Sequence, residues 1–285
     1  MQPTPQHNQL MSKHRVLRFE PQLRLERRPQ DGQHETEQPD HSASLGDSIT
    51  SSTRIRFSVH TGVITNVLGA FESFNQPSVL IPPEVVELTG ISNEMVAGHK
   101  IDAAALVDFA SAANIIIAHN AGFDRKFAER SWDFFRHRHW AWPSTGIDWR
   151  RHGLAGAKLA YLLNECGFFH GAHRALDDCH ATLEILARPL PGTNKTALAA
   201  LLDQARAKSF RVWAEGAPFN LKELLRRRRY RWNDGSDGRP KSWHIDVEET
   251  ALANELDFLR KEIYGYDVDV LCAEITSLDR YSTRV

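Results

Sequence analysis

Hydrophobic and polar residues follow a regular pattern along most of the chain after residue 54, and a much weaker one before it. Val16–Leu25 (VLRFEPQLRL) alternates well enough to predict a short strand, which Pro21 interrupts. Residues 26–53 hold only three apolar side chains, too few to offset the chain entropy of an ordered stretch. We therefore interpret residues 1–53 as an irregular N-terminal segment.

Residues 54–190 have the pattern of an α/β domain. Two alternating runs, 54–60 and 63–71, flank Thr61-Gly62, which is typical of a β-hairpin. Ile115–Ala118 is an apolar run with polar flanks, which is typical of a strand buried on both faces. Helical spacing of apolar residues predicts helices within 82–90, 102–112, 122–135, 153–166 and 175–187.

The rest of the chain predicts a second, smaller unit. Residues 191–209 are expected to form a linker with a helix at Ala197–Ala207, and residues 210–285 a small α+β module with an irregular tail. Within the module we expect a strand at 210–214, a basic helix at Leu221–Arg229, two Trp-bearing strands and a helix at Glu248–Ile263.

Composition narrows the class of protein. The 285 residues are 41% hydrophobic and 25% charged, which is enough for one sizeable core and a smaller unit. The net charge of −1 does not require a polyanionic partner, so any nucleic-acid surface must come from local clusters of Lys and Arg. No run approaches the roughly 18–20 apolar residues of a membrane helix, and the N-terminus lacks an apolar signal core. With three Cys residues at no metal-type spacing, we expect a soluble, cytoplasmic protein.

Two short motifs carry most of the candidate chemistry. In the first, a buried strand ends in the polar turn His119–Phe123, and Asp124 opens a helix. In the second, His173 stands five positions before Asp178, so both side chains can face one cleft if a helix starts between them. Carboxylates suit Mg²⁺ or Mn²⁺, and a His that titrates near neutrality suits activation of water for phosphodiester hydrolysis.

Taken singly, each of these residues has a plainer interpretation. An Asp near the start of a helix is most often a cap or a partner of the helix dipole, and His173 alone would fit a capping or surface role. Asp177 is expected to face solvent. The motifs are therefore informative only in combination.

In combination, the motifs resemble those of the DnaQ-like (DEDD) exonucleases, a family that includes the proofreading epsilon subunit of bacterial replicative DNA polymerase. The stretches IPPEVVELTGISNEMVAG, IIIAHNAGFD and HRALDDCHATLEIL are similar to three successive segments of the family. The His five positions before the last Asp is similar to the DEDDh branch. The resemblance covers about residues 54–190 and implies a ribonuclease H-like α/β fold, a mixed sheet flanked by helices.

The resemblance also implies roles for individual residues. Asp124 and Asp178 would bind metal, with two Mg²⁺ or Mn²⁺ ions expected in a complete site, and His173 would activate water. The residues implied to shape the site around the 3′ end of the substrate are His119, Asn120 and Phe123.

The family's first motif, a strand that ends in Asp-x-Glu, has no counterpart before residue 60. The nearest carboxylates with this spacing are Glu35 and Glu37, and no apolar strand precedes them. They are weak candidates for metal ligands, because a loop must hold such groups to within about 0.5 Å. One hypothesis is that residues of about 27–53 reflect a shifted reading frame. If the segment is genuine, we expect the activity to be impaired.

A cluster of basic and aromatic residues marks the C-terminal module. Arg side chains can pair with phosphates, and exposed aromatic rings can stack on bases at about 1–3 kcal/mol per base. An equally weighted interpretation is that the Trp residues fill a small core and that the Arg run is a solvated helix face. The candidate nucleic-acid-binding residues are Arg226, Arg227, Arg228, Arg229, Tyr230, Trp232, Lys241 and Trp243.

The sequence therefore predicts an enzyme, a metal-dependent 3′–5′ exonuclease that acts on single-stranded 3′ ends of DNA in replication or repair. The alternative is a catalytically weakened nucleic-acid-binding protein with the same fold. RNA stays open as a substrate, because the residues do not reveal whether a 2′-hydroxyl is tolerated. A polymerase partner cannot be read from the sequence.

Overall fold

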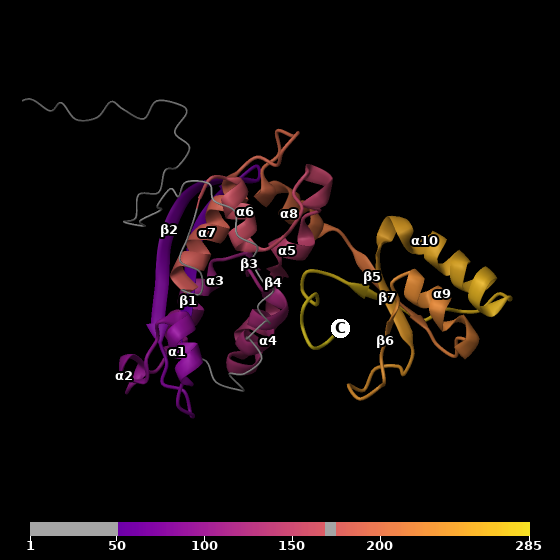
Figure 1. The fold of residues 1–285 in the computed structure, drawn as a ribbon, viewed down its shortest axis with the longest axis horizontal. Helices are drawn as coiled ribbons and strands as arrows, with labels where there is room; N and C mark the ends of the chain where they lie inside the picture. The colour runs from indigo at the N-terminus through magenta and orange to yellow at the C-terminus, as the bar shows by residue number, and fades with distance from the viewer. Residues whose placement is uncertain (1–50, 169–174) are drawn as a thin grey trace, which may run out of the picture.

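The computed structural model describes residues 51–168 and 175–285, which form two lobes joined by a short connection (Figure 1). The larger lobe spans residues 51–207, and the smaller lobe begins at residue 208. No helix of the described residues is long and apolar enough to cross a membrane.

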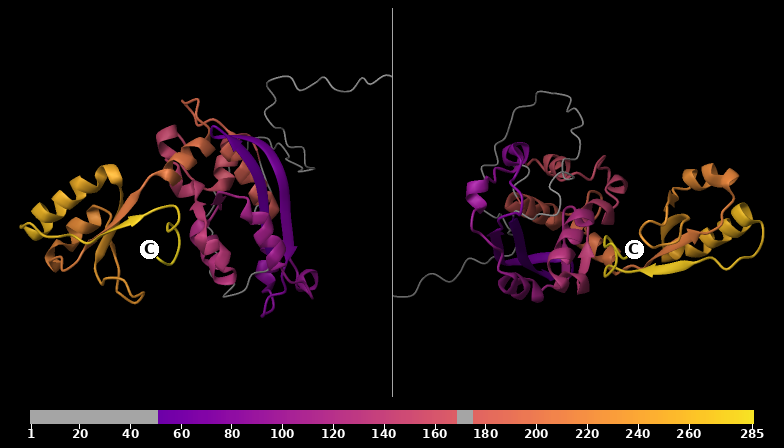
Figure 2. Two further views of the ribbon diagram at one scale, coloured as in Figure 1. Left: turned by 180° about the vertical axis from the view of Figure 1, so that it is seen from behind. Right: turned by 90° about the horizontal axis from the view of Figure 1, so that it is seen from below.

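A long antiparallel hairpin opens the larger lobe, with strands β1 (Ser51–His60) and β2 (Val63–Phe74). Thr61 and Gly62 both have positive φ, 49° and 78°, as a tight two-residue hairpin turn requires. A Cβ at residue 62 would lie 2.5 Å from the Cβ of Ala199, so only glycine fits this turn. The predicted hairpin is confirmed, and it lies on the side of the lobe that faces away from the smaller lobe (Figure 2).

Three short helices follow the hairpin, and local signals set their ends. Pro83 stands in the first turn of the first helix, and Gly90 ends it with a left-handed φ of 69°. The side chains of Ser92 and Asp102 accept backbone N–H bonds at the starts of the next two. The helices are α1 (Pro83–Thr89), α2 (Asn93–Val96) and α3 (Ala103–Ser111).

Two parallel strands form the second piece of sheet in this lobe. β3 (Ile115–Ile117) and β4 (His139–Ala141) pair along their length, and α4 (Ala121–Ser131) and the 3-10 helix η2 (Asp133–His137) connect them. The predicted strand and the helix after it are confirmed. The helix stops at Ser131, earlier than expected, because Trp132 adopts extended backbone.

Helices α6, α7 and α8 pack together against the inner face of β1. Leu186 of α7 and Leu198 of α8 are fully buried there, and Ile55 and Phe57 of β1 pack against the same cluster. The helix predicted from residue 153 begins only at Leu159. The elements are α5 (Pro143–Gly146), η3 (Arg150–His152), α6 (Leu159–Glu165), α7 (Ala175–Ala187) and α8 (Ala197–Arg206).

The sheet of the larger lobe is divided into two pairs of strands. β1 bonds to β2 and β3 bonds to β4, and no strand of the described residues joins the two pairs. An antiparallel pair and a parallel pair flanked by helices agree with the predicted mixed α/β class. One edge of β1 and one edge of β3 are left without a strand partner in the described part of the chain.

The smaller lobe is a four-stranded antiparallel sheet in the order β6-β7-β5-β8. Its helices pack around Val212, Leu225 and Leu259. The expectation of an irregular tail is wrong in part, because the tail contains β8. The elements are β5 (Ser209–Ala214), η4 (Phe219–Leu221), α9 (Lys222–Arg227), β6 (Arg231–Trp232), β7 (Trp243–Glu248), α10 (Glu249–Phe258), the π-helical turn η5 (Leu259–Tyr264) and β8 (Cys272–Ile275).

After β8 the chain returns to the larger lobe and fastens the two lobes together. Arg125 of α4, which is 0% exposed, donates hydrogen bonds to the carbonyl oxygens of Ser277, Leu278 and Arg280. Arg280 in turn donates to the carbonyl oxygen of Gln204 at the end of α8, at 2.8 Å. These bonds link elements more than 70 residues apart in the sequence.

Candidate active site

Asp124 lies at the point where β3 gives way to α4. The strand ends at Ile117, and the helix starts at Ala121 with Asn120 before it. The carboxylate of Asp124 accepts a hydrogen bond from the backbone N–H of Asn120 at 3.2 Å. The capping interpretation of Asp124 therefore holds, and the same bond aims the carboxylate back toward the end of β3.

Gly122 allows the first turn of α4 to approach the strand that follows it. A Cβ at this position would lie 2.9 Å from the ring of Trp142, which no side chain tolerates without a shift. The small residue in the first motif thus positions the helix that carries Asp124.

Asp178 lies in the first turn of α7, one turn earlier than expected, and lines the same cavity as Asp124. The thiol of Cys179, next to it, donates to the carbonyl oxygen of Thr53 at 3.9 Å, a weak contact between α7 and β1. The two acidic residues, 54 positions apart in sequence, are close enough that the charge of Asp178 raises the pKa of Asp124.

Burial is the main cause of an unusual titration at Asp124. Burial raises the pKa of its carboxyl to about 6, the guanidinium of Arg54 and the N–H of Asn120 oppose the shift, and Asp178 adds to it. Burial also lowers the pKa of Arg54, while the negative charge of Asp124 raises it. A carboxyl group whose pKa is raised toward neutral pH, and which lies beside a second carboxylate, is typical of functional sites.

Arg54 is a site residue that the sequence did not reveal. Its guanidinium donates to the carbonyl oxygen of Thr53 at 2.9 Å and lies 5.7 Å from the ring centre of Phe135. In an alternating strand an Arg normally faces solvent, so only the packing of the lobe could show that this one turns inward beside Asp124.

The other predicted site residues divide into two groups. His119, Asn120 and Phe123 all line the cavity next to Asp124, and the ring of Phe123 lies 4.4 Å from that of Phe127. The residues predicted as base and as replacement ligands lie outside the described part of the chain; these are His173, Glu35 and Glu37.

The described residues do not make up the two-ion site that the resemblance implies. Within residues 51–168 and 175–285, no group of three His, Cys, Asp or Glu side chains is arranged to hold a metal ion. Asp124 and Asp178 offer two carboxylates, whereas a pair of divalent ions needs more oxygen ligands than these. Further ligands would have to come from another part of the polypeptide.

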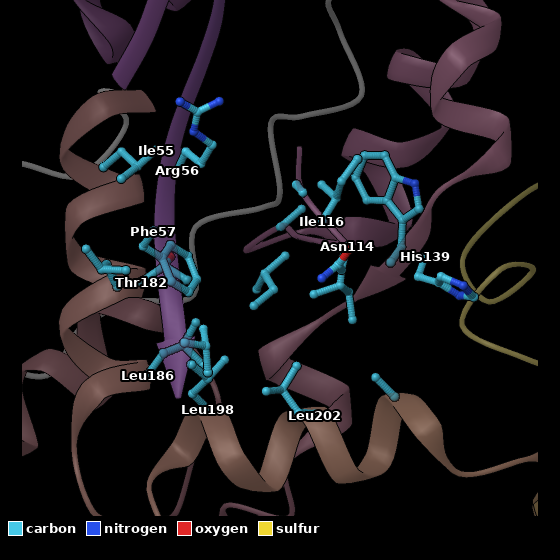
Figure 3. Close-up of a pocket in the computed structure, with 18 of the residues that line it drawn as sticks. Ile55, Arg56, Phe57, Asn114, Ile116, His139, Thr182, Leu186, Leu198 and Leu202 are labelled. Carbon is cyan, nitrogen blue, oxygen red and sulfur yellow. The ribbon is translucent and has the colours of Figure 1, made fainter. Parts of the chain in front are cut away.

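The cavity that holds both carboxylates is large and runs between β1 and β3. Its volume is about 1950 Å³. Figure 3 shows Ile55, Arg56 and Phe57 of β1 on one side and Ile116 on the other, with α7 and α8 contributing apolar side chains. The acidic pair therefore lines a large opening rather than a small closed pocket.

In the smaller lobe, part of the predicted nucleic-acid surface is used for internal contacts. Tyr230 is buried, and its hydroxyl donates to Glu255 at 2.8 Å, so the prediction that it stacks on bases is wrong. Arg228 pairs with the same carboxylate at 2.8 Å, and Arg226 pairs with Glu223 at 2.8 Å.

Several other residues of the predicted nucleic-acid surface are exposed. Trp232 is 50% exposed, and its ring lies 5.5 Å from that of Trp243, over which the guanidinium of Arg226 is placed at 5.6 Å. Arg227, Arg229 and Lys241 are also exposed. The geometry leaves a short basic and aromatic strip along α9, β6 and β7.

Comparison with known proteins identifies the family of the chain. The sequence model of the exonuclease family matches residues 45–186. A protein of Mycobacterium tuberculosis named as a bifunctional exonuclease/endonuclease is 35% identical over 133 residues, which cover 42% of this chain and 20% of that protein. The PolC-type DNA polymerase III of Thermotoga maritima is 27% identical over 180 residues, covering 57% of this chain and 12% of the polymerase. The chain thus spans a fifth or less of the length of these two relatives.

A shorter relative is covered more fully. The epsilon subunit of DNA polymerase III from Aquifex aeolicus is 30% identical over 139 residues, which cover 46% of this chain and 67% of the subunit. The match to the family model, residues 45–186, begins before β1, ends within α7 and includes both acidic residues, Asp124 and Asp178. The chain therefore belongs to the DnaQ-like exonuclease family.

Proposed function

We propose that the chain is a metal-dependent 3′–5′ exonuclease that hydrolyses phosphodiester bonds at 3′ ends of DNA, in replication or repair. The observation that carries the proposal is that Asp124 and Asp178, from distant segments, line one large cavity close enough for their charges to interact. Family membership supports nucleic-acid hydrolysis as the reaction class. Mg²⁺ or Mn²⁺ are the proposed ions, because carboxylates prefer such hard cations.

We propose different roles for the acidic pair and for the residues around it. Asp124 and Asp178 supply negative charge for cations, and bound divalent ions would neutralise charge on the phosphate. His119 and Phe123 line the same cavity, and we propose that they contact the terminal nucleotide. His173 is proposed as the base that takes a proton from water, because it precedes Asp178 by five residues.

The pKa of Asp124 gives the proposal a pH dependence. Only the ionised carboxylate attracts a cation, and this group is half protonated near pH 6. Activity at limiting metal concentration should therefore rise as the pH increases through about 6, and it should rise less steeply with excess metal because cation binding favours ionisation.

The direction of cleavage tests the proposal. A single-stranded DNA oligomer labelled at its 3′ end should release the label with the first nucleotide, whereas a 5′ label should appear in a ladder of shortening products. EDTA should stop the reaction, and added Mn²⁺ should restart it. Early release of the 5′ label would contradict the proposed polarity.

Matched variants test the residues. Asp124→Asn and Asp178→Asn should each lower the rate by about 100-fold or more, because even indirect partners of metal ligands contribute about 10- to 100-fold. Asp177→Asn is the control, since Asp177 is adjacent in sequence but does not line the cavity. Full activity of Asp178→Asn would exclude the acidic pair as the reaction centre.

The second candidate is a weakened nuclease that mainly binds nucleic acid. One observation favours this candidate. Among the described residues no third acidic, His or Cys side chain joins Asp124 and Asp178 in a metal site, and the guanidinium of Arg54 lies close enough to affect Asp124. Tight binding of an oligomer with no release of nucleotides at any Mn²⁺ concentration would select this candidate.

A further inference from the structure

The smaller lobe displays a line of alternating aromatic rings and cations. The ammonium group of Lys222 lies 4.0 Å from the ring centre of Phe219. The guanidinium of Arg226 lies 5.6 Å from the ring centre of Trp243, which is 5.5 Å from the ring centre of Trp232. Phe219, Lys222 and Arg226 are three and four positions apart along η4 and α9, so they lie on the same side of these helices. We call these five residues the aromatic–basic strip.

Two rings of the aromatic–basic strip contribute little to the core of this lobe. Phe219 is 79% exposed and Trp232 is 50% exposed. Among the described residues, neither belongs to the hydrophobic cluster around Val212, Leu225 and Leu259. Folding gains free energy from an apolar ring in proportion to the area removed from water, so these two rings stabilise the fold less than buried rings would. Exposed aromatic rings next to cations are typical of a binding surface.

Positive charge is concentrated in the same part of the chain. Residues 219–243 hold eight Lys or Arg residues and three Asp or Glu residues, a net charge of +5, whereas the whole chain has a net charge of −1. Four of the arginines form ion pairs with carboxylates. The basic side chains to which the described residues offer no ion pair are Lys222, Arg227, Arg229 and Lys241. A local excess of positive charge attracts a polyanion.

The backbone at the end of α9 places one of these cations at a cost to the fold. Arg229 has a left-handed φ of 69° at a position where helices usually have glycine. Its N–H bonds to the carbonyl oxygen of Arg226, and the N–H of Tyr230 bonds to that of Leu225, which closes a tight turn after the helix. A left-handed conformation costs free energy in every residue with a side chain. Because Arg229 is exposed and the described residues offer it no ion pair, its charge has no use inside the fold.

We propose that the aromatic–basic strip and Arg229 bind an unpaired stretch of nucleic acid, with the rings stacking on bases and the cations pairing with phosphates. Every base has a flat face, so stacking on Phe219 and Trp232 requires no particular sequence. In a duplex those faces are covered by neighbouring base pairs, so the rings favour single strands. The choice of DNA rests on the proposed function, whereas the binding of unpaired nucleotides does not.

Fluorescence anisotropy of the full chain with a labelled single strand of about 20 nucleotides tests the stacking. EDTA in the buffer prevents metal-dependent hydrolysis, so the result does not depend on nuclease activity. Phe219→Ala and Trp232→Ala together should weaken binding of the single strand by roughly 20-fold, because each ring contributes about fivefold. Affinity for a blunt duplex of the same length should stay unchanged.

Arg229→Gly separates binding from folding. Glycine removes the cost of the left-handed φ, so the midpoint of thermal unfolding should rise. Affinity for the single strand should nevertheless fall, and the slope of log Kd against log salt concentration should decrease by about 0.7. Weaker binding by a more stable protein cannot result from loss of folding. Lys261→Gln is the control for charge, since this exposed lysine of η5 pairs with Asp257 at 2.8 Å and should leave affinity and slope unchanged.

Several outcomes would overturn the proposal. Unchanged single-strand affinity of the double ring variant would exclude stacking, and an equal loss of affinity for single strand and duplex would show that the rings serve the fold. A more stable Arg229→Gly variant with native affinity would remove Arg229 from the surface. Self-association of the native chain that is lost in Trp232→Ala would identify a second copy as the occupant. Binding as expected in EDTA, with no nucleotide release in Mn²⁺, would contradict the nuclease proposal alone.

Discussion

In the smaller lobe four strands form one continuous antiparallel sheet, whereas in the larger lobe the described strands remain two separate pairs. The charged groups of the two lobes differ in the same way. In the smaller lobe Arg211 holds Asp246 through two hydrogen bonds of 2.6 and 2.8 Å. In the larger lobe Asp124 and Asp178 place like charges near each other. The first arrangement stabilises the fold, and the second costs stability unless a cation binds, which is the usual mark of a site.

The largest effect is expected where the two lobes are joined. Arg125→Ala removes a fully buried guanidinium and leaves Glu129, its partner at 2.5 Å, with its remaining ion pair to Arg284. We expect a loss of about 3–5 kcal/mol in the free energy of unfolding, measured with urea. Arg130→Ala, an exposed position on the same helix, should cost less than about 1 kcal/mol. Equal effects would mean that the lobes do not depend on this contact.

The next effect is confined to the smaller lobe. Glu255 is buried and accepts hydrogen bonds from Arg228 and from the hydroxyl of Tyr230, both at 2.8 Å. Glu255→Ala should destabilise this lobe by about 3 kcal/mol, at the low end for a buried pair because Arg228 can turn to solvent. Trp fluorescence during thermal unfolding would follow it. Glu223→Ala, which breaks an exposed pair, should be close to neutral, and nuclease activity should survive both changes.

A third effect has the opposite sign and depends on pH. Because the folded state raises the pKa of Asp124 from 3.8 to about 6, the protonated form is favoured on folding and stability falls as the pH rises through 6. Asp124→Asn should therefore be more stable than the native chain by about 2 kcal/mol at pH 8 without metal. The difference should vanish near pH 3.5. Unfolding midpoints of both proteins at both pH values would measure this difference in stability. A native chain that is more stable at pH 8 than the Asp124→Asn variant would contradict our account of the site.

The smallest effect concerns the exposed strip of the smaller lobe. Trp232→Ala should weaken binding of single-stranded DNA by about 1 kcal/mol, roughly fivefold, if the ring stacks on a base. Tyr266, an exposed aromatic residue that follows η5, provides the control. Fluorescence anisotropy at several salt concentrations would measure both. Equal affinity of the Trp232 variant and the native chain would favour the structural role of this aromatic pair.

Local patterns in the sequence predicted the elements whose signals are themselves local. Alternation around Thr61-Gly62 predicted the hairpin, and helical spacing predicted α7 and α8 almost to the residue. The acidic motifs also predicted Asp124 and Asp178 as candidate site residues. Each of these features depends on residues within a few positions of one another.

Features that depend on distant partners were missed. β8 has only four residues and is a strand because β5, about 60 positions earlier, offers it an edge. Nothing in the sequence marked Arg54 as a site residue, and Tyr230 was predicted to bind nucleic acid, whereas the packing places Arg54 beside Asp124 and buries Tyr230. The divided sheet was also unforeseen, because no property of β1 or β3 alone reveals whether its second edge is covered.

The contact between α4 and the end of the chain has a consequence for the acidic site. Asp124 and Arg125 are adjacent, so the residue that faces the cavity and the residue that anchors Ser277–Arg280 share a single peptide bond. Trimming the chain before residue 277 would remove the carbonyl acceptors of Arg125 and leave Glu129 as its partner, one residue away from the acidic site. The far end of the polypeptide thus helps to hold the helix that carries Asp124.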